Sequence, residues 1–469
     1  MSDRQTATSD NVPSGDAAIA DALREPPVLF ALLDRWVARG WLRALDRAFA
    51  AFLAREVPDA PAPLLLAAAL ASHQLGRGHV CLDLAQTLAE PDLALSLPPE
   101  GDSLEDPPPR PSQLLGELTL SGWQEALTHP LIIGHGPGNT PLVLDDTRLY
   151  LRRFWHHERS IQQHIASRLE SGSYCRNKAE SGEGADRRPD QAMNLDALSR
   201  ALAALFPMGD HLDWQKAACA LAARSPFAVI TGGPGTGKTT TVVKLLALLQ
   251  TLALGAGQRA LRIRLAAPTG KAAARLNESI AGQVSSLELD GLAPLLAVLE
   301  KEESSNPSWE RTSVRESGAE ALRKAIPTDV TTLHRLLGSR PDTRHFRHHA
   351  RNPLPLDVLV VDEASMVDVE MMAALLDALP PRGRLVLLGD KDQLASVEAG
   401  SVLGDLCARA EGGHYTPETA DWLAEATGQA LPPERLDANG APLDQAIAML
   451  RHSHRFDAES GIGQLASAV

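Results

Sequence analysis

The stretch FAVITGGPGTGKTTTVVKLLAL, Phe227 to Leu248, decides the fold of this chain. It opens with an apolar, β-branched run, which is typical of a buried parallel strand. A glycine-rich turn follows, and a helical pattern begins at Lys238. Within the turn, Gly232, Gly237, Lys238 and Thr239 occupy the fixed positions of the motif G-x-x-x-x-G-K-[ST]. The order of strand, loop and helix is the context that this phosphate-binding motif requires.

The residue types in this loop fit the chemistry of phosphate binding. Glycines let backbone N–H groups close around phosphate oxygens, and the helix N-terminus adds partial positive charge. We expect Lys238 to reach the β- and γ-phosphates of ATP, and Thr239 to bind Mg²⁺ through its hydroxyl. The alternative is a glycine turn that merely joins a strand to a helix. The predicted nucleotide-binding residues are Gly232, Gly233, Pro234, Gly235, Thr236, Gly237, Lys238, Thr239 and Thr240.

Composition and charge restrict the class of protein. The 469 residues predict roughly two to four domains. With 44% hydrophobic and 22% charged residues, the composition is that of a soluble globular protein, and the four cysteines lack paired or metal-like spacing. We therefore expect a reducing, cytoplasmic compartment. The apolar run at Pro61 to Ala71 is too short to span a membrane and predicts a buried helix. A net charge of −14 argues against a protein coated in positive charge, but it allows a local basic track.

A second candidate strand, Leu356 to Val361, ends in Asp362 and Glu363. Because the carboxyl ends of parallel strands meet at one edge of a sheet, we expect this pair beside the phosphate loop. Asp362 is predicted to hold Mg²⁺, directly or through water, and Glu363 to orient and deprotonate the attacking water. Without the loop upstream, such a pair after a strand would be a common helix cap.

Three further polar residues are candidates for the same site. Gln393 follows a third strand, Arg384 to Leu388, where it could contact the γ-phosphate and report its loss. Gln215, before the phosphate loop, could make a two-pronged hydrogen bond to adenine. Arg455, in the segment LRHSHRF, could complete the site from a second domain. A solvated surface side chain is the alternative for Gln215 and for Arg455.

Polar and basic segments after the strands suggest contact with nucleic acid. The turn after Leu261 to Ala267 carries Thr269, Lys271 and Arg275, which an enzyme that only hydrolyses nucleotide would not need. The segment Gly338 to Arg351 is rich in arginine and histidine and includes Phe346 as a possible stacking ring. An ordinary turn and a solvated charged face are the alternatives. The predicted DNA-binding residues are Thr269, Lys271, Arg275, Thr332, His334, Arg344 and Arg347.

Taken in order, the motifs resemble those of superfamily 1 helicases, and in detail those of the RecD family, the alpha subunits of bacterial exodeoxyribonuclease V. The resemblance covers residues 211–407 densely and extends to Ser72–Leu84 and Arg148–Glu158. It implies an ATP-driven 5′-to-3′ motor on single-stranded DNA that works beside RecB and RecC chains in double-strand break repair. The motifs that carry it are Gln215, GGPGTGKTTT, APTGKAAARL, TLHRLLG, VVDEASMVD, GDKDQLASVEAGSVLGDL and LRHSHRF.

The resemblance also sets the expected domains of an α/β chain. A mainly helical, partner-docking domain is expected over residues 1–190, with a polar linker at 170–191. A RecA-like P-loop domain with a parallel sheet follows over 191–445, with a small subdomain inserted at about 282–330. Residues 446–469 are expected to begin a second RecA-like domain, of which the family has a full copy. The chain is therefore expected to hold half of the ATP cleft.

Three other functions stay open from the sequence. The chain could be an ATP-gated module that binds DNA or docks on a subunit without helicase activity. It could also be a stand-alone RecD-like helicase, which the resemblance at Ser72–Leu84 disfavours. A small-molecule P-loop kinase is disfavoured by Gln393 and by the arginine-rich segment before Asp362.

Overall fold

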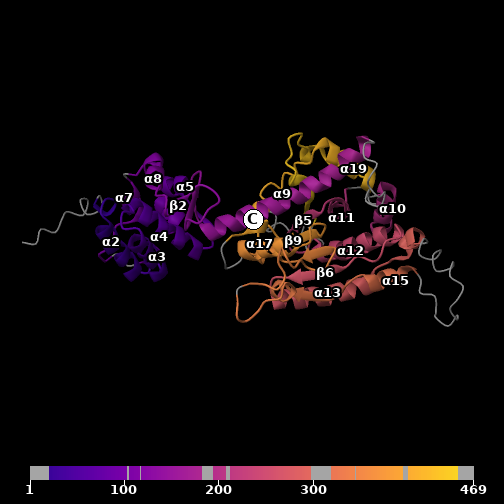
Figure 1. Ribbon diagram of the computed structural model, residues 1–469. Helices are drawn as coiled ribbons and strands as arrows, with labels where there is room; N and C mark the ends of the chain where they lie inside the picture. Colours follow the sequence, from indigo (N-terminus) through magenta and orange to yellow (C-terminus); the bar gives the residue numbers. More distant parts are fainter. Residues whose placement is uncertain are drawn as a thin grey trace, which may run out of the picture. The chain divides into compact units, whose positions relative to one another are not determined.

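The computed structural model describes residues 21–102, 105–116, 118–181, 194–207, 212–296, 318–343, 345–393 and 400–452. The chain divides into two compact units (Figure 1). The division falls between Arg159 and Ser160, and Gly400 also belongs to the first unit. In the described ranges, no helix combines the length and the apolar character that crossing a membrane requires.

The first unit is mainly helical and carries a small sheet. Its strand order is β1-β4-β3-β2, and β4 pairs antiparallel with both β1 and β3. Helix α4 is buried along most of its length, which confirms the buried helix predicted at Pro61 to Ala71. The elements are α2 (Pro26–Ala38), α3 (Ala44–Glu56), α4 (Ala62–Gly76), β1 (Cys81–Asp83), α5 (Leu84–Ala89), α6 (Pro91–Leu95), α7 (Pro111–Leu115), α8 (Leu120–Ala126), β2 (Ile133–Gly134), β3 (Leu142–Asp145), β4 (Arg148–Leu151) and the start of α9 (Arg152–Ser181).

The second unit is built on a parallel sheet with strand order β10-β5-β9-β8-β6-β7. Every pair of neighbouring strands in it runs parallel. Its elements are α10 (Leu195–Leu205), α11 (Trp214–Arg224), β5 (Phe227–Gly232), α12 (Lys238–Gly255), β6 (Ile263–Ala267), α13 (Gly270–Ser286), η2 (Asp290–Leu292), α15 (Gly318–Ala325), β7 (Val330–Thr332), α16 (Leu333–Leu337), β8 (Val358–Val361), η3 (Ala364–Met366), α17 (Val369–Ala378), β9 (Arg384–Gly389), α18 (Val402–Leu406), α19 (Pro417–Thr427), η4 (Pro433–Arg435), η5 (Asp444–Ala446) and β10 (Ile447–Leu450).

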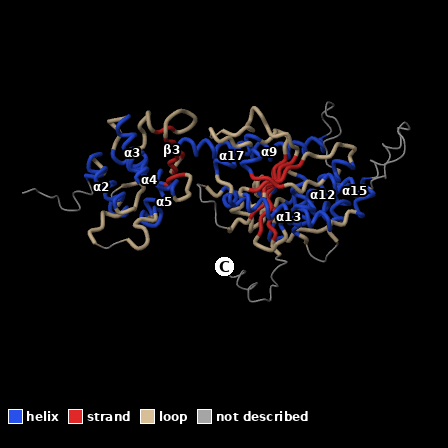
Figure 2. The backbone as a smooth tube through the Cα atoms, turned by 90° about the horizontal axis from the view of Figure 1, so that it is seen from below, coloured by secondary structure: helices blue, strands red, loops and turns tan. Residues whose placement is uncertain are grey.

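Both faces of this sheet are buried, as its apolar strands require. Ile230, Val360 and Leu388 join the core that helices α10 to α13 cover. Val229 and Leu387 alternate with them along the strands and are buried as well, so the opposite face is also covered. Figure 2 shows the strands of this unit as a central layer with helices on either side. The α/β class and the parallel sheet predicted from the sequence are confirmed.

The boundary expected near residue 190 differs from the structure. The division at Arg159 lies inside α9, a helix that continues to Ser181 and so covers the first half of the predicted linker. Gly172 lies within this helix. A single glycine destabilises a helix by only about 1 kcal/mol relative to alanine, so it does not have to end one. The rest of the predicted linker, from residue 182, lies outside the described residues.

Two other domain expectations also need correction. Residues 447–450 form β10, the edge strand beside β5, so they complete the first sheet instead of opening a second domain. The apolar, β-branched stretch at Ile447 suits a parallel partner of β5, and residues 453–469 lie outside the described ranges. The described ends of the segment 282–330 pack into the core of the same unit through Leu292 and Leu322. These described ends are therefore part of that unit, and residues 297–317 lie outside the described ranges.

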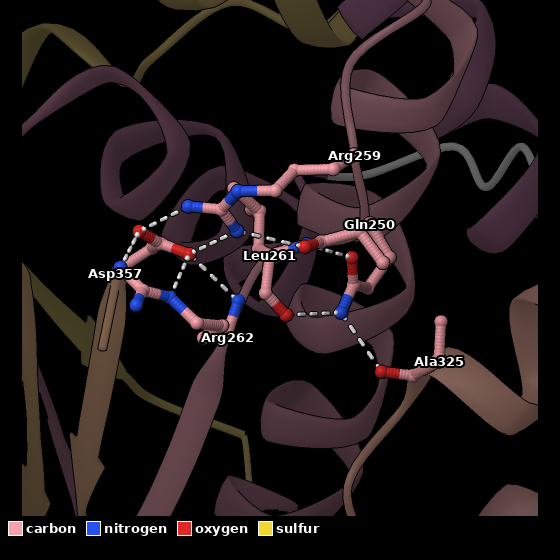
Figure 3. Close-up of polar contacts among 7 residues, drawn as sticks. Gln250, Arg259, Leu261, Arg262, Ala325 and Asp357 are labelled. Atoms are coloured by element: carbon pink, nitrogen blue, oxygen red, sulfur yellow. Dashed lines mark hydrogen bonds and ion pairs between the residues drawn. The ribbon is translucent and has the colours of Figure 1, made fainter. Parts of the chain in front are cut away.

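A charged clamp fixes the amino ends of β6 and β8 (Figure 3). Arg259 donates from Nη1 and Nη2 to the two carboxylate oxygens of Asp357, at 2.7 and 2.9 Å. The backbone N–H of Arg262 donates to the same carboxylate at 2.8 Å. These hydrogen bonds, led by those from Arg259, hold the pKa of Asp357 well below its usual range. Beside the clamp, the buried Gln250 bonds both backbone groups of Leu261, which orders the entry to β6.

Candidate active site

The loop between β5 and α12 has the shape that its glycines predict. Gly235 and Gly237 have φ values of 80° and 84°, which L side chains rarely adopt. Gly232 is required for a different reason. A Cβ there would lie 2.8 Å from the carbonyl oxygen of Leu450 and 3.0 Å from its Cβ, so β10 leaves no room for a side chain. The loop conformation therefore depends on glycine at three of its positions.

Backbone carbonyl groups of the phosphate loop hold the Lys238 ammonium group in place. Its Nζ donates to the carbonyl oxygens of Gly232 and Gly233, at 2.6 and 3.0 Å. The Thr236 hydroxyl also donates to Gly233, at 2.9 Å. A cation thus lies beside the start of α12, where unpaired N–H groups and the helix dipole already favour an anion. Thr239 and Thr240 are half-buried in the first turn of that helix.

The two carboxylates lie at the same edge of the sheet as this loop. Asp362 and Glu363 directly follow β8, which is separated from β5 by one strand, β9. Burial raises the pKa of Asp362 to about 6, and the Glu363 charge adds to the rise. The positive charge of Lys238 acts to lower the pKa of Asp362, so the ammonium group and the carboxylate interact electrostatically at this edge of the sheet. Glu363 itself has a left-handed backbone with φ of 53°.

Oxygen donors from two loops could hold a divalent cation here. A threonine hydroxyl and a carboxylate are the hard ligands that Mg²⁺ prefers. Thr239 is the second residue of α12 and Asp362 directly follows β8, so these donors come from elements that meet at one edge of the sheet. This donor set fits the metal that accompanies a nucleoside triphosphate, and the rest of its ligands would be phosphate oxygens and water.

Gln215 and Gln393 reach this edge from different elements. Gln215 lies at the start of α11 and donates from Nε2 to the carbonyl oxygen of Thr236, at 3.2 Å. The helix therefore folds back onto the phosphate loop, as the adenine prediction assumes. Gln393 lies in the loop after β9, and its Oε1 accepts a hydrogen bond of 3.4 Å from the hydroxyl of Ser365, just after the two carboxylates.

The candidate DNA residues lie at the same edge, over neighbouring strands. Strands β6 and β7 are adjacent and parallel, so the loops that follow them emerge side by side. Thr269 caps α13, and Thr332 caps α16, each with its hydroxyl. Lys271 and Arg275 are exposed on α13.

The basic segment after α16 folds back onto that helix. The N–H of Arg347 donates to the carbonyl oxygen of Gly338 at 3.0 Å, and the exposed ring of His334 meets Phe346 edge to face at 6.0 Å. These contacts hold Phe346 and Arg347 against α16 and the glycine that follows it. Arg344 and Arg455 lie outside the described residues.

Sequence reasoning missed three residues that shape this edge. Ser365 holds Gln393, and Thr231 accepts a hydrogen bond from the loop that carries it. Arg451, directly after β10, donates to the carbonyl oxygen of Glu411 at 2.7 Å, and its guanidinium lies 5.1 Å from the ring centre of Trp214. Ser365 and Thr231 adjoin recognised motifs, which is the signal that could have drawn attention to them. Arg451 lies within the quoted motif LRHSHRF, but its place beside this sheet could not be predicted, because β10 was not predicted as part of it.

Comparison with known proteins identifies both units. The family described as the N-terminal domain of RecBCD enzyme subunit RecD matches residues 38–150, and an AAA domain family matches residues 215–399. The second unit is therefore a nucleotide-binding domain. The RecD subunit of Haemophilus influenzae is 37% identical over 86% of this chain and 56% of its own length. For the RecD subunit of Mycolicibacterium smegmatis, the identity is 37% over 88% of this chain and 54% of that protein.

The extent of these matches separates two kinds of relative. The chain spans about half the length of these two RecD subunits. The ATP-dependent RecD2 DNA helicase of Deinococcus radiodurans is also 37% identical, but over only 37% of this chain and 16% of its own length. Similarity to RecD subunits extends through the amino-terminal unit as well as the nucleotide-binding unit. The chain therefore belongs to the RecD family.

Proposed function

We propose that this chain supplies the nucleotide-binding motor domain of an ATP-dependent 5′-to-3′ translocase and helicase subunit that acts on single-stranded DNA. The observation that carries the proposal is the common edge of one parallel sheet. The phosphate loop, the carboxylates after β8 and the candidate DNA loops after β6 and β7 all open at it. A nucleotide site and a DNA surface on adjacent strands let the binding of one ligand change the affinity for the other.

Each site residue has a role in this proposal. Lys238 contacts the β- and γ-phosphates of ATP, and Gln215 recognises adenine. Thr239 and Asp362 hold Mg²⁺, which stabilises the charge that develops on the phosphates. Glu363 orients the attacking water and takes its proton. Gln393 and Arg455 contact the γ-phosphate, the latter from outside the described residues.

The partners follow from the family match. Similarity to the RecD amino-terminal domain over residues 38–150 supports a subunit of a RecBCD-type exodeoxyribonuclease V over a stand-alone helicase. We therefore propose RecB- and RecC-type chains as partners, single-stranded DNA at duplex ends as the substrate, and double-strand break repair in the cytoplasm as the process. The amino-terminal unit is proposed to dock on a partner chain.

The DNA half of the proposal is tested by binding to a fluorescent single strand over a series of salt concentrations. Arg275→Ala removes an exposed cation from α13, and Arg382→Ala removes one that precedes β9, at the opposite edge of the sheet. We expect Arg275→Ala to weaken binding and to reduce the slope of log affinity against log salt by about 0.7, the value for one phosphate contact on a single strand. Arg382→Ala should leave both quantities unchanged. Equal effects of the two substitutions, or no DNA binding by the unsubstituted chain, would contradict the proposed surface.

A further inference from the structure

Thr231 is a fully buried residue that immediately precedes the phosphate loop. It lies near the end of β5, where it pairs with Gly389, the last residue of β9. Its hydroxyl accepts a hydrogen bond of 3.1 Å from the backbone N–H of Lys391, which lies beyond the last paired residue of β9. Lys391 lies two residues before Gln393 in the loop after β9. A side chain on the phosphate-loop strand therefore holds the backbone of the neighbouring loop.

The same hydroxyl has a second partner behind it. The Thr231 side chain also interacts with the buried thiol of Cys407, the residue that follows α18. A hydroxyl has one proton to donate and lone pairs to accept, so it can accept from Lys391 while donating to sulfur. Burial raises the pKa of Cys407 to about 12, which keeps the thiol protonated at neutral pH. The hydrogen bond from Lys391 is the contact that places the Thr231 hydroxyl.

The loop after β9 is also held from the carboxylate side. Ser365 is buried, two residues beyond Glu363, and donates to Gln393. Gly389 permits this approach, because a Cβ there would lie 3.1 Å from the backbone nitrogen of Ser365. Hydrogen bonds thus run from the phosphate-loop strand to the Gln393 loop, and from there to the turn that follows the two carboxylates.

We propose that Thr231 is a positioning residue that ties the phosphate loop to the Gln393 loop, so that the two loops respond together when nucleotide binds. The inference rests on the proposed ATPase function and assigns the coupling to a hydroxyl that does not touch the nucleotide. If Thr231 were only a core residue, valine would serve equally well, because it has nearly the same shape. The hydroxyl is what distinguishes the two roles.

Hydrogen exchange of the purified chain, followed by mass spectrometry, tests the tie without requiring catalysis. Thr231→Val removes the hydroxyl, and Thr231→Ser retains it. Thr251→Val is the matched control, because that buried hydroxyl bonds only within α12, to the carbonyl oxygen of Ala247. We expect peptides covering residues 389–393 to exchange about tenfold faster in Thr231→Val, the effect of losing one hydrogen bond of ordinary strength. Thr231→Ser should keep the exchange of the unsubstituted chain.

Adding a slowly hydrolysed ATP analogue with Mg²⁺ tests the coupling. In the unsubstituted chain, the analogue should slow exchange in both the phosphate loop and residues 389–393. In Thr231→Val, it should slow exchange in the phosphate loop alone.

The outcomes separate this inference from the proposed function. Unchanged exchange at 389–393 in Thr231→Val, or an equal increase in Thr251→Val, would overturn the tie. Equal responses of both loops to the analogue in Thr231→Val would overturn the coupling. If the unsubstituted chain bound no nucleotide, the proposed function would fail and the coupling with it, whereas the comparison without nucleotide would still decide the tie.

Discussion

Glu363 adopts a backbone conformation that residues other than glycine seldom take, with φ of 53° and ψ of 39°. Such a conformation costs about 1–3 kcal/mol and persists only where its surroundings fix it. Here the surroundings are the end of β8 and the turn η3, in which Ala364 and Ser365 are buried. Strain at this position is consistent with a residue selected for its place beside Asp362.

Replacing Glu363 by glutamine separates water activation from nucleotide binding. Glu363→Gln keeps the size of the side chain but removes the basic carboxylate. We expect single-turnover hydrolysis of ATP to fall by about 100-fold or more. The dissociation constant for a fluorescent ATP analogue should change less than about threefold, because binding depends on other groups. Glu370→Gln, an exposed glutamate on α17, is the control. Turnover of Glu363→Gln at the unsubstituted rate would show that another group activates the water.

At this scale, the sequence predicts residues that belong to contiguous motifs. Lys238 and Thr239 follow from fixed spacing within one short stretch, because a single loop and helix start place them. Contacts between motifs follow no such rule. Thr231 meets Lys391 across 160 positions, and Ser365 meets Gln393 across 28. Only the strand order brings these pairs together, so spacing could not reveal them.

The clamp between the amino ends of β6 and β8 carries the prediction at the scale of elements. Asp357 gains hydrogen bonds from Arg259 and Arg262 that exist only in the folded chain, and its pKa is lowered. A carboxyl group whose pKa is lowered by folding stabilises the folded chain at pH values above its unfolded pKa, which is about 4 for aspartate. This stabilisation is lost as the pH falls below that unfolded pKa.

We therefore expect Asp357→Asn to lower the free energy of unfolding by about 1–3 kcal/mol at pH 7. The difference from the unsubstituted chain should narrow as the pH falls below about 4. Urea denaturation at a series of pH values measures both quantities. Asp421→Asn, an exposed carboxylate on α19, is the matched control. A constant difference at all pH values would show that the carboxylate charge is not the source of the stability.

Strands and helices with strong periodicity could be predicted, and ambiguous segments could not. The apolar runs before the phosphate loop and before Asp362 form β5 and β8 as expected, since each demands burial on both sides. The polar segment at 170–181 was expected as linker, yet it extends α9. Strand β10 was assigned to another domain, because its pairing with β5 depends on a contact across more than 200 residues. Local sequence patterns do not show which distant segments pair with each other.

At the scale of the whole molecule, two units that match different family models share one chain. The amino-terminal unit has the RecD amino-terminal domain, and the second unit has the nucleotide-binding AAA domain. Net charge is −14, so the basic residues that could follow DNA form a local group around α13 and the segment after α16. The proposed motor must couple nucleotide hydrolysis to DNA, and the common edge of the sheet is where that coupling is proposed.

The measurement that tests this account most directly is the ATP hydrolysis rate of the 469-residue chain, with and without single-stranded DNA. It is made on the chain alone and on the chain mixed with RecB- and RecC-type partners. Lys238→Ala is the negative control, because it removes the cation proposed to contact the phosphates. Lys244→Ala, on the same helix but packed against Phe206, controls for the loss of a lysine.

The account predicts that single-stranded DNA raises hydrolysis at least about fivefold in one of these settings. Lys238→Ala should abolish the activity, and Lys244→Ala should retain it. Hydrolysis that does not respond to DNA in any setting, or that survives Lys238→Ala at the unsubstituted rate, would contradict the account.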